Sequence, residues 1–91
     1  MASISEQRVD ENGIYIRAGN GRDILISPRE ILDRYSSASG TTEEKRLIAR
    51  EYVKNRIEQF LGRDMVAYEA IDIDFNMATG QPTSLIVRND I

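Results

Sequence analysis

Two aspartates near the C-terminus, Asp72 and Asp74, are the residues whose spacing first indicates chemistry. They alternate with isoleucines in the run AIDID, so in a strand both carboxylates point to the same side of a sheet. A carboxylate pair is typical of a divalent-cation site, but hard cations take several oxygen ligands, and only Asp64 and Glu69 are nearby candidates. The alternative is an ordinary one-faced sheet, in which acids in water alternate with buried residues. We expect this second arrangement, with no metal and no cofactor.

Three cations, Arg46, Arg50 and Lys54, recur every four residues and would form one stripe on a helix. A basic stripe of this kind can bind the phosphates of a nucleic acid. The same segment carries acids such as Glu51 and Glu58, and interleaved charges are typical of a solvated helix face with internal salt bridges. The net charge of −3 also disfavours a nucleic-acid or anionic-membrane partner. Nucleic-acid contact through this stripe therefore stands as the alternative function.

Histidine and cysteine are both absent from the 91 residues. Their absence removes the commonest general base, the thiol nucleophile and the usual ligands of zinc. The remaining carboxylates, lysines and tyrosines show no spacing that matches a catalytic motif, so we expect no enzyme. A small chain without cysteine is typical of a reducing compartment. With no segment resembling a signal peptide or a membrane span, we expect a cytoplasmic protein that does not contact membranes.

The stretch 19–21, Gly-Asn-Gly, has the composition of a phosphate-binding loop and also of a hairpin turn. A phosphate loop would open directly into a helix, but here a second alternating strand pattern comes first. A three-residue hairpin loop, with Gly21 in the left-handed region, places isoleucine opposite isoleucine. The predicted pairs are Ile14 with Ile26, Ile16 with Ile24, and Arg17 with Asp23.

Two helices are predicted between the hairpins. Ser27, Pro28 and Glu30 form an N-terminal signature, which predicts a short helix over residues 28–36. The stretch 41–44 repeats the capping box and begins a longer helix, which runs to about residue 61 and ends at Gly62. Its expected apolar side consists of Ile48, Tyr52, Val53, Ile57, Phe60 and Leu61.

A second hairpin is predicted at the C-terminal end, with the loop at 78–80 and Gly80 in the left-handed position. This register places Ile73 opposite Leu85 and Ile71 opposite Val87. The whole pattern predicts a single α+β domain over residues 13–91: a ββααββ two-layer sandwich with one short and one long helix on one face of an antiparallel sheet. Residues 1–12 are expected to form either a flexible segment or an extra edge strand.

Four apolar side chains are predicted on the outer face of this sheet, away from the helices: Tyr15, Leu25, Tyr68 and Ile86. A contiguous apolar group on an open sheet face is typical of a surface for a protein partner or a second copy. With no catalytic or metal motif in the chain, we expect a small protein–protein interaction module or a homodimeric structural or regulatory protein.

Overall fold

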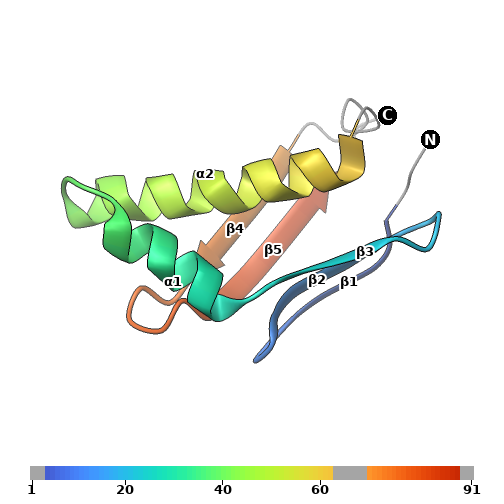
Figure 1. The fold of residues 1–91 in the computed structure, drawn as a ribbon, viewed down its shortest axis with the longest axis horizontal. Coiled ribbons are helices and arrows are strands. Elements are labelled where there is room, and N and C mark those ends of the chain that lie inside the picture. The colour runs from blue at the N-terminus through green and yellow to red at the C-terminus, as the bar shows by residue number, and fades with distance from the viewer. Residues whose placement is uncertain (1–3, 63–69, 89–91) are drawn as a thin grey trace.

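The computed structural model describes residues 4–62 and 70–88. Strands, two helices and further strands follow one another, which confirms the predicted α+β order with the extra N-terminal strand (Figure 1). The elements are β1 (Ile4–Asp10), β2 (Gly13–Ala18), β3 (Asp23–Ile26), α1 (Pro28–Ser37), α2 (Thr42–Leu61), β4 (Ala70–Phe75) and β5 (Pro82–Arg88).

The strands form two antiparallel sheets where a single sheet was expected. One has the order β1-β2-β3 and the other consists of β4 and β5. Strand β1 contacts β5, and Gln81 Nε2 donates to the Asp10 carbonyl, but the described residues form no ladder between these strands. The register of β1 shifts between Ile4 and Glu6. Such an irregularity bends a strand and increases its local twist.

The first hairpin has the predicted register. Ile14 pairs with Ile26 and Ile16 with Ile24. Gly21 has a φ of 91° and its N–H donates to the Ala18 carbonyl. This is the three-residue loop with a left-handed final glycine, so the Gly-Asn-Gly stretch is a hairpin turn.

The second hairpin also has the predicted strand register, although its loop is one residue longer than predicted. Ile73 pairs with Leu85, but the loop is closed by Asn76 N–H donating to the Gln81 carbonyl. The Asn76 side chain accepts from the Ala78 N–H and so organises a local turn that begins earlier than the glycine pattern indicates. An irregularity between Asp74 and Phe75 compensates for the extra loop residue, so the pairs beyond it are unchanged.

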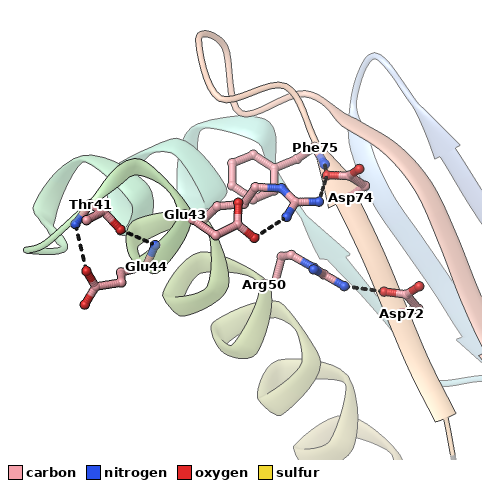
Figure 2. Close-up of polar contacts among 8 residues, drawn as sticks. Thr41, Glu43, Glu44, Arg50, Asp72, Asp74 and Phe75 are labelled. Carbon is pink, nitrogen blue, oxygen red and sulfur yellow. Dashed lines mark hydrogen bonds and ion pairs between the residues drawn. The ribbon is translucent and has the colours of Figure 1, made fainter.

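Both helices begin at the predicted caps. The Ser27 hydroxyl accepts from the Glu30 N–H. Thr41 and Glu44 form a full capping box, with bonds of 3.1 and 3.2 Å (Figure 2). These bonds satisfy N–H groups that a helix leaves without partners in its first turn. The long helix ends at Gly62, which has a φ of 65°.

The buried side of α2 is a line of residues at four-residue spacing. Ala49, Val53, Ile57 and Leu61 are buried, and α2 packs against β4 (Figure 1). The prediction that Ile48 belongs to this side was wrong, because its side chain is 48% exposed. At 100° per residue, position 48 lies about 140° around the helix from Val53, so it faces away from the sheets.

The hydrophobic core joins side chains from both sheets and both helices. Its buried members are Ile14, Ile16, Ile26, Ile31, Ala49, Val53, Ile57, Leu61, Ile73 and Phe75. The Tyr35 ring meets the Phe75 ring edge to face, at a centroid distance of 6.1 Å. Neither of the two described helices combines the length and the apolar character needed to cross a membrane.

Candidate functional site

The predicted acidic pair and the predicted basic stripe meet in the structure. Arg46 Nη2 lies 3.2 Å from Asp74 Oδ1, and Arg50 Nη2 contacts Asp72 Oδ1 (Figure 2). Arg46 also binds Glu43 at 2.9 Å, one turn earlier in α2. The two candidate sites, which are separate in the sequence, therefore form one series of ion pairs between a helix and a strand. We call this series the α2–β4 ladder.

The α2–β4 ladder forms because the rise of four residues along a helix nearly equals the rise of two residues along a strand. Four residues of an α-helix rise about 6 Å, and two residues of a strand rise about 6.6 Å. A helix that runs antiparallel to a strand can therefore place every fourth side chain beside every second one. The next rung after Arg50 and Asp72 would join Lys54 to position 70, which is alanine and has no carboxylate. Among the described residues, Lys54 forms no ion pair.

Asp74 is held more tightly than a surface carboxylate. Its Oδ1 accepts from the Phe75 N–H at 2.8 Å as well as from Arg46. The Phe75 hydrogen bond, together with those from Arg46 and its charge, lowers the pKa of Asp74 below its ordinary value, although partial burial acts in the opposite direction. In turn, Asp74 raises the pKa of Arg46. Both groups stay charged at neutral pH.

A metal ion would have to compete with these arginines for the two aspartates. Each carboxylate already accepts from a guanidinium group, and charge-assisted bonds of this kind are among the stronger ones in proteins. In the described parts of the chain, no three acidic side chains come together as cation ligands. Asp64 and Glu69, the further ligands considered above, lie outside the described residues.

A shallow groove between α2 and β4 was missed by the sequence reasoning. Its volume is about 220 Å³, and it is lined by Leu47, Arg50, Glu51, Lys54 and Ile73. Leu47 is 50% exposed at this groove. The sequence does contain a signal for it. Leu47 and Ile48 directly precede Ala49, and a helix that buries Ala49 directs these two side chains toward solvent.

The four residues of the predicted outer surface are not all brought together. Tyr15 and Leu25 are directly opposite one another on β2 and β3, as predicted, and Leu25 is 52% exposed. Ile86 is 45% exposed but lies on β5, opposite Asp72 in the other sheet. Tyr68 lies outside the described residues.

Charged side chains on β1 separate the two halves of this outer surface. Glu6 and Arg8 are paired with β2 residues of the Tyr15 face, and both β1 and, to a lesser extent, β2 contact β5. The surface between Leu25 and Ile86 therefore carries charges. The apolar group that remains contiguous is the one formed by Tyr15 and Leu25.

Tyr15 is the centre of a polar network on this face. Its hydroxyl donates to Asp23 at 3.1 Å and accepts from Arg17 Nε at 3.0 Å, while the guanidinium of Arg8 lies 4.7 Å from the centre of its ring. The hydrogen bond to Tyr15, with the nearby Glu6 carboxylate, raises the pKa of Arg17. The network fixes the Tyr15 ring and leaves Leu25 as its exposed apolar neighbour.

Comparison with known proteins gives no match to this chain among protein-family models, curated sequences or solved structures.

Proposed function

We propose that this chain is a non-catalytic protein–protein interaction module of a reducing, intracellular compartment, and that it binds through the outer face of the β1-β2-β3 sheet. The observation that carries this proposal is Leu25, which is 52% exposed on that face beside the ordered ring of Tyr15. Tyrosine and arginine are enriched at protein interfaces, and an exposed leucine beside them adds apolar area that a partner can bury. The absence of cysteine supports the compartment.

Charge pairing within the fold also supports the proposal. Arg46 and Arg50 bind Asp74 and Asp72, so two of the three stripe cations and both candidate metal ligands are already engaged with one another. A group that must first leave a partner binds a new ligand less strongly. The Leu25 side chain has no such internal partner to lose.

The experiment is an affinity pull-down from a lysate of the source cells, with nuclease added, that compares the wild type with two variants. Leu25→Glu places a charge on the proposed surface, whereas Leu47→Glu places the same charge at an equally exposed leucine on α2. We expect Leu25→Glu to lose an association that Leu47→Glu retains, whether the associated protein is captured in the pull-down or is a second copy detected by sedimentation of the purified chain. Both variants should melt near the wild-type temperature. Equal retention by both variants contradicts the proposal, as does unfolding of Leu25→Glu.

Nucleic-acid binding is the alternative, and it has Lys54 in its favour. Lys54 lines the α2–β4 groove and forms no ion pair with the described residues. Phosphate contacts are strongest at low salt, so a binding titration at about 50 mM salt is the decisive condition. Binding there that weakens steeply with salt, and weakens further in Lys54→Glu, would replace the proposed function with this one.

A further inference from the structure

Among the described residues β1 and β5 contact one another without a ladder, whereas the β3 and β4 edges have no strand beside them, and these two edges differ in protection. Strand β4 is shielded: the α2–β4 ladder binds its outward aspartates, its register is irregular at Phe75, and the Phe75 N–H is taken by Asp74. Charges and irregularities of this kind are the devices that stop edge strands from pairing. Strand β3 has a regular register and contains no proline.

The hydrogen-bonding groups of β3 that point outward can be identified from its hairpin. Ala18 N–H donates to the Arg22 carbonyl, so this pair is bonded within the hairpin. Bonded and non-bonded pairs alternate along an antiparallel ladder, which makes Ile24 the next residue bonded to β2. The main-chain N–H and C=O groups of Asp23 and Leu25 therefore point away from β2. In the described part of the chain no element bonds to them.

Apolar side chains flank this edge on both faces of the sheet. Leu25 is exposed on the outer face, and Ile24 is half-buried on the inner face. Phe60 of α2 is also half-buried, and its ring is covered by the guanidinium of Arg22 at 5.5 Å. A strand added to this edge would thus gain main-chain hydrogen bonds together with apolar contacts above and below.

We infer that the occupant of the β3 edge is the β3 strand of a second copy, added antiparallel about a two-fold axis at Ile24. This names the partner of the proposed function and rests on it. In this register Asp23 of each copy faces Leu25 of the other, so both outward pairs exchange main-chain bonds, four in total, with no like charges opposed.

The neighbouring registers are less favourable for physical reasons. A shift toward the turn sets Asp23 opposite Asp23 of the second copy, which is repulsive. A shift the other way extends the pairing past Ile26 to Ser27 and Pro28, where α1 begins and proline has no N–H to donate. The same self-pairing at β4 would place Asp72 or Asp74 opposite an acid in its central registers. The charge pattern therefore favours β3 over β4 and one register over the others.

The β3 pairing is expected to be weak. Two four-residue strands bury far less surface than the roughly 1,200 Å² of a stable interface. This small area predicts a dissociation constant of roughly 0.1–1 mM for the dimer. Sedimentation velocity of the full chain across this range measures it. We expect reversible dimers for the wild type and for Leu47→Glu, and a monomer for Leu25→Glu.

Cysteine cross-linking tests the register, and the chain's lack of cysteine makes single variants unambiguous. Ile24 of one copy lies directly opposite Ile24 of the other as a non-hydrogen-bonded pair. The two Cα atoms of such a pair are about 4.5 Å apart, which is within the range of a disulfide. Leu25 and its copy are diagonal, about 7–8 Å apart. Under mild oxidation Ile24→Cys should give a folded covalent dimer several times faster than Leu25→Cys.

Three outcomes overturn the inference, and they are separable from the proposed function. Faster cross-linking of Leu25→Cys rejects the register, and loss of dimer in Leu47→Glu but not in Leu25→Glu moves the interface to α2. A wild type that stays monomeric throughout rejects the second copy. If the wild type is monomeric but Leu25→Glu still loses its partner in the pull-down, the proposed function stands and a different protein occupies the surface.

Discussion

Replacement of Gly80 by alanine tests whether the β4–β5 turn is packed on α1 as the structure shows. Gly80 has a φ of 78°. A Cβ atom added there would lie 2.8 Å from Leu32 Cβ and 2.9 Å from Leu32 N, and closer still to the Pro28 carbonyl oxygen. Gly21 is the matched control, because its φ is 91° but an added Cβ would meet nothing within 4 Å. The two sites share the backbone conformation and differ in the neighbouring atoms.

The expected magnitudes follow from these two terms. A left-handed backbone costs a non-glycine residue about 1–2 kcal/mol, partly offset by about 0.4–1 kcal/mol from the stiffer unfolded chain. Gly21→Ala should therefore lower the free energy of unfolding by about 1 kcal/mol. At Gly80, overpacking against the backbone of α1 adds about 1–3 kcal/mol. Gly80→Ala should therefore cost about 2–4 kcal/mol.

Urea unfolding followed by far-UV circular dichroism measures both values. For a domain of this size, 1 kcal/mol corresponds to about 4–8 °C in melting temperature, so thermal melting resolves the difference as well. Equal losses in Gly80→Ala and Gly21→Ala would refute the packing of the turn on α1. The positions of β4 and of the α2–β4 ladder relative to the helices would then need revision.

The other predictions concern the core, the capping box and the ladder. Ile57→Ala should lower the free energy of unfolding by about 2–5 kcal/mol, because Ile57 is buried. Ile48→Ala, at an exposed isoleucine of the same helix, should change it by less than about 0.5 kcal/mol. Equal effects would contradict the burial of α2. Thr41→Ala removes the cap and should cost about 0.5–2 kcal/mol, with the exposed neighbour Thr42→Ala as its control, all measured by urea unfolding. Asp74→Asn should cost up to about 1 kcal/mol at pH 7, because the side chain is half exposed. Because the folded state lowers the pKa of Asp74, its stabilisation is present above the ordinary value of 3.8 and is lost as the pH falls through the lowered value. Stability curves of wild type and Asp74→Asn should therefore converge only below about pH 4, and convergence near pH 6 would contradict the assignment.

Elements governed by neighbouring residues were predictable from the sequence. The helix caps at Ser27 and Thr41, and the loop that ends at Gly21, involve groups within a few residues of one another. Their geometry follows from the local preferences of these residue types, so no distant contact is needed to specify them. The isoleucine pairs of the first hairpin follow from its turn, whereas the second hairpin keeps its predicted pairs although its loop is one residue longer.

The candidate site was predictable only in part. The outward positions of Leu25 and Ile86 follow from strand alternation and are correct. Their separation is not a property of either strand: it depends on how the two sheets meet, where β1 and β2 both contact β5. The position of β1 beside β5 is a tertiary contact between opposite ends of the chain, which no local pattern specifies.

The sequence by itself determined the caps, the hairpin registers, the extent of the long helix and the alternation of apolar and charged residues, because each depends on interactions over a few residues. Only the tertiary structure decided that the acids and the cations neutralise one another. Asp72 and Asp74 lie 22 and 28 residues from Arg50 and Arg46, and they meet because α2 packs antiparallel along β4 with a matching rise. The packing of the core thus converts two candidate ligand sites into one structural contact, and it leaves the main-chain groups at the β3 edge, where we propose that a partner binds, without a hydrogen-bonded neighbour among the described residues.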